Sequence, residues 1–120
     1  MPTSSGSDLP QNMLNCIELC NDCHKACLET VMYCLQQGGK HAEANHVRLM
    51  FDCAEICQTS ANFMVRGSDL HGHTCEACAA VCERCAEECD KLGEDPHMAA
   101  CAEICRACAQ TCREMAAASH

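Results

Sequence analysis

Aromatic side chains are nearly absent from this 120-residue chain, which contains one Tyr, two Phe and no Trp. The length suits one domain with one core. Such a core normally relies on aromatic and branched aliphatic side chains, so other residues must fill much of this interior. We assign no role beyond packing to Tyr33, Phe51 and Phe63.

An excess of positive charge is also missing. The chain has 17 acidic and 8 basic residues, which give a formal net charge of −9, and it has no Lys- or Arg-rich run. Proteins bind phosphate backbones through clustered basic residues, so this balance argues against a nucleic-acid partner. We expect the acidic surface mainly to keep the protein soluble.

Signals for export or membrane insertion are lacking as well. The first residues, MPTSSGSDLPQNML, include no basic segment, apolar run or small-residue cleavage site. Nowhere does the sequence contain an apolar stretch long enough to cross a bilayer. If Met1 is the native start, we expect a cytoplasmic protein that has no membrane partner and keeps its thiols reduced.

Cysteine is what this chain has in abundance, with 16 residues in all. Residues 75–89 read CEACAAVCERCAEEC, in which the gaps between cysteines alternate between three and four. This is the rhythm of a heptad, so on a helix these thiols form one stripe. Three other segments have the same rhythm. The stripes together contain Cys16, Cys20, Cys23, Cys27, Cys34, Cys53, Cys57, Cys75, Cys78, Cys82, Cys85, Cys89, Cys101, Cys105, Cys108 and Cys112.

Glycine, proline and capping residues divide the chain into four helical segments. Ser68 is a candidate N-cap for the third, and Asp95 precedes Pro96 at the start of the fourth. Amphipathic helices with short connections predict an all-α, antiparallel up-down-up-down four-helix bundle with a cysteine-lined core. We expect a flexible N-terminal segment over 1–8 and a single domain over 9–117, with helices at about 9–37, 41–66, 69–92 and 96–117.

Antiparallel packing also predicts which side chains share a level along the bundle axis. The two central levels consist of cysteines alone. They are expected to hold Cys20, Cys57, Cys78 and Cys108, and Cys23, Cys53, Cys82 and Cys105. Toward one end, the expected levels combine Cys27, Cys85 and Cys101 with Met50, and Cys34 and Cys89 with His46 and Met98. Toward the other end, they combine Cys16, Cys75 and Cys112 with Ser60, followed by Met13, Met64 and Met115.

Thiols in heptad register indicate metal binding, because Leu or Ala would stabilise the same bundle without the risk of oxidation. Soft thiolates favour Cu(I), Zn(II) and iron–sulfur clusters. Disulfides within a helix fit less well, since cysteines four residues apart have nearly parallel Cα–Cβ bonds. A zinc or iron–sulfur protein and a thiol–disulfide redox protein therefore remain the alternatives to copper binding.

Charge balance favours copper among these metals. Sixteen thiolates in a tube of low dielectric constant need compensating cations. About four Zn(II) or about eight Cu(I) would leave roughly eight negative charges, whereas about sixteen Cu(I) would leave none. We therefore expect multiple Cu(I) ions, near one per cysteine, each of which displaces a proton as it binds.

The cysteine layout resembles that of the bacterial copper storage proteins, particularly their cytosolic branch. The likeness covers nearly the whole chain and rests on the C-x-x-x-C pairs of each helix, on CAEIC at 53–57 with a Met seven residues later, and on CAEICRACAQTC at 101–112. The resemblance implies Cu(I) storage rather than catalysis, and assembly as a homotetramer. A copper chaperone or a copper enzyme would then be the protein partner.

The two ends of the thiol column are expected to differ in their donors. The stripe of the second helix continues through His46 and Met50, which we add to the cysteines as predicted metal ligands. His41, His97 and Met98 gather at the same end, which we expect to be the copper entrance. The alternative entrance is the opposite end, which has His71 and His73. The three methionines at the other end are expected to form an apolar plug and not to bind metal. No Ser/His/Asp set or carboxylate pair indicates catalysis.

Overall fold

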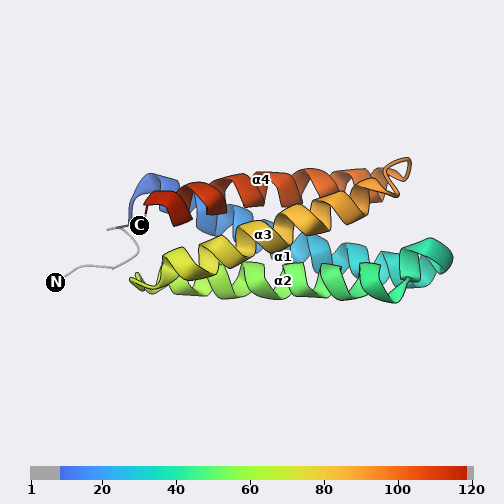
Figure 1. The fold of residues 1–120 in the computed structure, drawn as a ribbon, viewed down its shortest axis with the longest axis horizontal. Coiled ribbons are helices and arrows are strands. Elements are labelled where there is room, and N and C mark those ends of the chain that lie inside the picture. Colours follow the sequence, from blue (N-terminus) through green and yellow to red (C-terminus); the bar gives the residue numbers. More distant parts are fainter. Residues whose placement is uncertain (1–8, 119–120) are drawn as a thin grey trace.

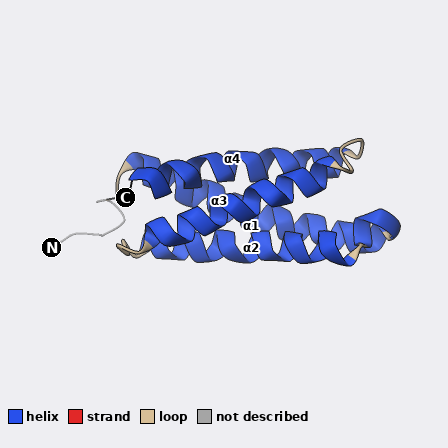
Figure 2. Cartoon of the chain, viewed as in Figure 1, coloured by secondary structure: helices blue, strands red, loops and turns tan. Residues whose placement is uncertain are grey.

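Four long helices form an antiparallel bundle (Figure 1). The computed structural model describes residues 9–118, and within this range every regular element is helical (Figure 2). The predicted all-α, up-down-up-down bundle is therefore confirmed, while the predicted flexible segment 1–8 lies outside the described residues. The elements are α1 (Gln11–Gln37), the 3-10 helix η2 (Gly39–Ala42), α2 (Ala44–Val65), α3 (His71–Asp90) and α4 (Pro96–Ala118).

The connection between α1 and α2 contains η2, so α2 begins three residues later than expected. Gly38 and Gly39 have φ angles of 74° and 55°. Glycine adopts this left-handed region without strain because it has no Cβ atom. The Gly38 N–H donates to the Cys34 carbonyl at 3.2 Å, which ends α1 and directs the chain into the turn.

Helix α3 also begins later than expected, at His71 in place of residue 69. The prediction that Ser68 is its N-cap is wrong, because Leu70 occupies that position. The Ser68 hydroxyl accepts a hydrogen bond from the Leu70 N–H at 3.1 Å, and the Ser68 carbonyl accepts one from the His71 N–H at 3.2 Å. Ser68 thus stabilises the turn before the helix, as short hydroxyl side chains often do.

Asp95 caps the start of α4, as its place before Pro96 predicts. Its Oδ1 accepts a hydrogen bond from the His97 N–H at 2.9 Å. Its backbone carbonyl accepts hydrogen bonds from the N–H groups of Met98 and Ala99, both at 3.0 Å. Pro96 has no N–H to satisfy, so it suits the first helical position.

The core of the bundle is built from sulfur side chains and small residues. All 16 cysteines are buried, and so are several alanines and methionines. Val31 is fully buried and lies four residues after Cys27 and three before Cys34, so it occupies the stripe position between them. Its presence explains the gap of seven in the first stripe. Ile17 is also buried, although the cysteine spacing does not single it out.

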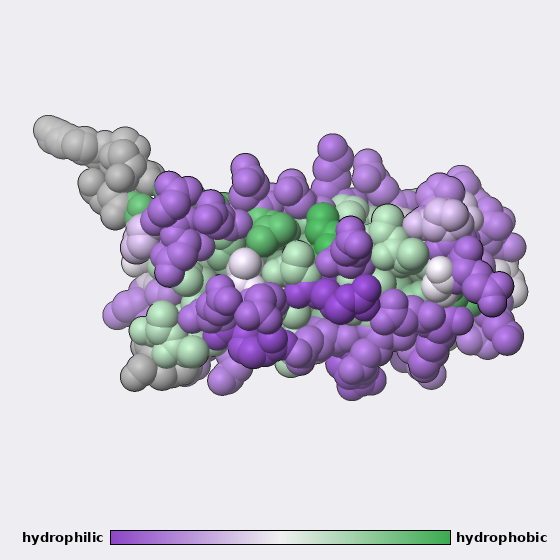
Figure 3. Space-filling model, turned by 90° about the horizontal axis from the view of Figure 1, so that it is seen from above, coloured by the Kyte–Doolittle hydropathy of each residue, from purple (hydrophilic) through white to green (hydrophobic). Residues whose placement is uncertain are grey.

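The exterior of the bundle is mainly polar. Figure 3 shows the face over α4, where charged and polar side chains surround a narrow apolar strip. Among the helices of residues 9–118, none combines the length and the apolar character that a membrane span requires.

Candidate metal centre

Sulfur atoms line the bundle axis as a column in which neighbours are in contact, and all 16 cysteines are free thiols. The Cys57 Sγ lies 3.8 Å from the Cys108 Sγ and 3.7 Å from the Cys78 Sγ. The Cys108 Sγ lies 3.7 Å from the Cys20 Sγ. The first predicted central level is therefore confirmed.

The second predicted central level is confirmed as well. The Cys23 Sγ lies 4.0 Å from the Cys53 Sγ and 3.8 Å from the Cys105 Sγ. The Cys53 Sγ is 3.6 Å from the Cys82 Sγ, which in turn is 3.5 Å from the Cys57 Sγ of the first level. Thiol contacts thus run along the axis as well as across it, so one sulfur can serve two metal ions.

Several sets of sulfurs are spaced as the ligands of one soft metal ion would be. Within each set, all Sγ atoms lie within 4.8 Å of one another. Tetrahedral bonds of about 2.3 Å from metal to sulfur place the sulfurs about 3.8 Å apart, so little rearrangement is needed. The sets are Cys20, Cys78, Cys108 and Cys112; Cys23, Cys53, Cys57 and Cys82; Cys23, Cys27, Cys53 and Cys105; Cys57, Cys78, Cys82 and Cys108; and Cys16, Cys75 and Cys112.

Neighbouring thiols of the column form hydrogen bonds with one another. The Cys105 thiol is the largest cause of a lowered pKa at both Cys23 and Cys101, because it hydrogen-bonds to their sulfur atoms. The pKa of Cys105 itself is raised, chiefly by its hydrogen bond with Cys101. Hydrogen bonds between neighbouring thiols therefore shift their pKa values in opposite directions.

At one end the column finishes in three different donors, Cys34, His46 and Met98, which we call the mouth level. The Cys34 Sγ lies 3.3 Å from the His46 Nε2 and 3.5 Å from the Met98 Sδ. Burial raises the pKa of Cys34 to about 11 and lowers the pKa of His46. In residues 9–118, the His46 Nδ1 is the one buried side-chain nitrogen or oxygen without a hydrogen-bond partner. A neutral imidazole beside a thiol and a thioether suits Cu(I).

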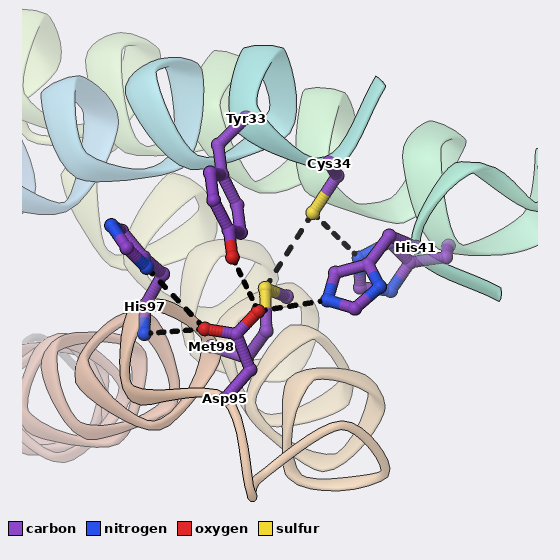
Figure 4. A network of polar contacts seen from close by, with 7 residues as sticks. Tyr33, Cys34, His41, Asp95, His97 and Met98 are labelled. Carbon is purple, nitrogen blue, oxygen red and sulfur yellow. Dashed lines mark hydrogen bonds and ion pairs between the residues drawn. The ribbon is translucent and has the colours of Figure 1, made fainter. Parts of the chain in front are cut away.

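Four polar residues cover this end of the column and form what we call the mouth network: Tyr33, His41, Asp95 and His97 (Figure 4). The Tyr33 hydroxyl donates to the Asp95 Oδ2 at 2.6 Å, and the His41 Nε2 lies 3.0 Å from the same oxygen. The His97 Nδ1 lies 3.3 Å from the Asp95 Oδ1, and its ring stacks on Tyr33 with centroids 4.1 Å apart. Asp95 thus ties both loops at this end to the helices.

The mouth network corrects the expectation that Tyr33 only packs. The Tyr33 hydroxyl, followed by the His97 backbone N–H and the His41 ring, holds the pKa of Asp95 down at about 2. In return, the hydrogen bond with Asp95 raises the pKa of Tyr33. No sequence spacing links Tyr33 to Asp95, because the contact depends on how the loops fold; only the clustering of His41 and His97 pointed to this end.

The opposite end of the column is apolar. The Cys75 Sγ lies 3.4 Å from the Ser60 hydroxyl oxygen and 3.8 Å from the Met64 Sδ. Ser60 is fully buried, so it takes the place in this level that a cysteine has in the central levels. The predicted plug residues are buried or half-buried here: Met13, Met64 and Met115.

Every predicted metal ligand lies inside the bundle. All 16 cysteines are buried, together with His46 and Met50. The arrangement offers many soft donors at short range and keeps them away from water. Which of these residues bind a metal stays a prediction.

Comparison with known proteins relates the whole bundle to one family. A model of the copper storage protein family matches residues 9–117. A Bacillus subtilis (strain 168) protein described as the uncharacterised cysteine-rich protein YhjQ is 41% identical over 70 residues, or 52% of this chain. The chain spans 65% of the length of that curated relative, slightly less than two thirds.

Solved structures are similar over most of the chain. Nmul_A1745 of Nitrosospira multiformis has a TM-score of 0.85 and 50% identity, covering 90% of this chain and 97% of that one. The Cu(I)-bound copper storage protein BsCsp3 has a TM-score of 0.82 and 39% identity, covering 88% and 99%. A cytosolic copper storage protein from Streptomyces lividans, with five coppers, has a TM-score of 0.78 and 31% identity, covering 89% and 93%.

Proposed function

The chain belongs to the copper storage protein family, and we propose that it stores Cu(I) at about one ion for each of its 16 cysteines. The observation that carries this proposal is the column of buried thiols, whose neighbouring Sγ atoms lie 3.5–4.0 Å apart. Thiolate is the soft ligand that Cu(I) prefers. Since the sulfurs have neighbours both across and along the axis, bridging thiolates can hold as many ions as there are cysteines.

Charge balance supports a loading near one to one. A fully loaded column would pair about sixteen thiolates with about sixteen Cu(I), so no net charge would be buried. Each ion would displace one proton from a thiol. A partly loaded column also buries no net charge, because thiols without copper keep their protons.

Zinc is the second candidate, and the four-cysteine sets favour it through their near-tetrahedral spacing. In the set Cys23, Cys27, Cys53 and Cys105, five Sγ pairs lie 3.7–4.0 Å apart. However, a Zn(II) ion with four thiolates keeps two negative charges. Such a charge is costly inside an apolar bundle, so copper is the better occupant.

The part of the column at and next to the mouth level supplies donors of a different kind. We propose that His46 and Met50 bind copper together with the cysteines near them. Support comes from the unpartnered Nδ1 of His46 and from the burial of both side chains on the axial face of α2. Near this end α2 contributes no cysteine, so an imidazole and a thioether complete the coordination.

Storage, and not catalysis, is the activity that this geometry supports. The thiols are buried, so an organic substrate has little room to bind beside them. We place the protein in the cytoplasm, where thiols stay reduced, and expect a copper chaperone or a copper enzyme to exchange copper with it.

An exposed apolar face supports assembly as a homotetramer. Leu28, Met32 and Leu35 follow one face of α1 at helical spacing, and all three are exposed. Phe51 of α2 is exposed as well and lines a shallow groove together with Leu28. Contiguous apolar patches of this kind mark interfaces between subunits. Analytical ultracentrifugation of wild type and Phe51→Glu tests this point, since the charge should dissociate the assembly.

An anaerobic Cu(I) titration of the fully reduced protein against a chromophoric Cu(I) chelator tests the storage function. We expect the protein to outcompete the chelator until about sixteen ions have bound. Saturation after one to four ions would contradict storage and would instead indicate a zinc-type or regulatory metal site. A titration with Zn(II) under the same conditions serves as the comparison.

A further inference from the structure

Cys101 differs from the other cysteines in its access to solvent. It is 2% exposed, whereas the remaining cysteines are 0% exposed. The axial routes are covered at both ends, by the mouth network at one end and by buried methionines at the other. A copper ion therefore meets its first accessible thiol on the side of the bundle.

A groove between α1 and α4 leads to this cysteine. Its volume is about 350 Å³, and Cys101 forms part of its wall. Ala26 and Ala100, which also line it, are too small to close the space between the two helices. Tyr33 and His97 form a polar rim at the side of the mouth network.

The thiols behind Cys101 continue inward without a gap. The Cys101 Sγ lies 4.0 Å from the Cys27 Sγ, which lies 3.7 Å from the Cys105 Sγ. Cys27 and Cys105 belong to a four-cysteine set with Cys23 and Cys53. An ion that arrives at Cys101 can thus pass from sulfur to sulfur into the central levels.

We propose that this groove is a lateral portal through which a small thiol carrying Cu(I) delivers the ion to Cys101; the inference rests on the proposed storage function. In the transfer, the Cys101 sulfur forms a bond to copper while one bond from copper to the donor sulfur breaks. The departing donor thiolate takes the proton of the Cys101 thiol, and the copper remains Cu(I).

A variant that fills the groove tests the portal. Ala100→Phe places a large ring in the groove, and Ala107→Phe is the matched control, because both alanines are exposed and lie seven residues apart on α4. Anaerobic stopped-flow mixing with Cu(I)–mercaptoethanol follows the Cu(I)–thiolate absorbance in the near ultraviolet. We expect Ala100→Phe to slow the uptake by about tenfold. Ala107→Phe should load at the wild-type rate, and so should His41→Ala, because His41 belongs to the mouth network but does not line the groove.

Two results would overturn the portal. One is wild-type uptake by Ala100→Phe with its circular dichroism and final copper content unchanged. The other is faster uptake by His41→Ala than by wild type, since that would indicate an axial route through the mouth network.

Alkylation provides a test that uses no copper. Brief treatment of the reduced, metal-free protein with iodoacetamide, followed by peptide mapping, should modify Cys101 first, and Ala100→Phe should protect it. First modification at Cys34 would contradict the portal. Because this order is independent of copper capacity, a failure of the storage function and a failure of the portal can be distinguished.

Discussion

The two ends of the thiol column are closed by different chemistry. At the mouth level, Cys34 meets an imidazole and a thioether, and a network centred on a carboxylate lies above them. At the plug end, Cys75 meets a serine hydroxyl and a thioether, and methionines close the tube. Polar contacts exchange readily with water, whereas exposing a buried methionine costs about 1.5–3 kcal/mol. Small movements should therefore occur more easily at the mouth end.

Copper loading should change the stability of the protein more than any substitution does. It should also make both ends equally rigid, because thiolate bonds to copper would cross-link the helices along the column. Binding at one site to about 1,000 times Kd stabilises a protein by about 4 kcal/mol, and many sites add to this. We expect a much higher melting temperature and slow amide exchange at both ends. Calorimetry and hydrogen exchange before and after copper removal provide the check. If the copper-loaded and metal-free proteins had the same melting temperature, the cross-linked column would be contradicted.

Removing one methionine from each end should separate packing from copper binding. Met98 and Met64 are both fully buried, so Met98→Ala and Met64→Ala should each lower the free energy of unfolding by about 2–5 kcal/mol. Met98→Ala should in addition weaken the binding of the last copper ions, because its thioether belongs to the mouth level. Denaturant unfolding and competition titrations measure the two quantities. Equal copper binding by both variants would show that Met98 only packs.

The mouth network should make the stability of its end depend on pH. The pKa of Asp95 is lowered from 3.8 to about 2, so its carboxylate stabilises the fold fully above pH 4 and loses this contribution as the pH falls through about 2. Asp95→Asn should therefore melt below wild type at pH 7, by less than the methionine variants do, and the difference should vanish near pH 2. At the plug end, Met64→Ala should keep its deficit across this range.

The contribution of the mouth network to stability should also decrease at high pH. The pKa of Tyr33 is raised by its hydrogen bond with Asp95, so the contribution of this bond is complete below pH 10 and decreases as the pH rises further. Tyr33→Phe, which keeps the ring that stacks on His97, is the matched control for the hydroxyl. A melting difference between wild type and Tyr33→Phe that is the same at pH 7 and at high pH would contradict the network.

The contrast between the ends also separates what the sequence could predict from what it could not. The central levels followed from periodicity, because cysteine gaps of three and four fix one helical face and antiparallel packing fixes the register. The mouth network joins Tyr33 of α1, His41 of η2 and Asp95 of the loop before α4. Their contacts depend on the path of the loops, including the positive φ of Gly38 and Gly39, which shifted the start of α2. Periodicity carries no information about such contacts.

Substitution of Ser60, at the plug end, should have the smallest effect on stability. Ser60 lies three residues after Cys57 on the stripe of α2, and its hydroxyl oxygen is 3.4 Å from the Cys75 Sγ. A cysteine fits the same space with little change of volume, so Ser60→Cys should alter the free energy of unfolding by less than about 1 kcal/mol. It completes a level of four thiols with Cys16, Cys75 and Cys112.

If the number of thiols sets the copper capacity, Ser60→Cys should bind about one ion more than wild type. Ser60→Ala is the control, since it removes the hydroxyl without adding a sulfur and should leave the capacity unchanged. Parallel Cu(I) titrations measure the difference. An unchanged capacity in Ser60→Cys would mean that the methionine plug, and not the count of thiols, determines where the copper column ends.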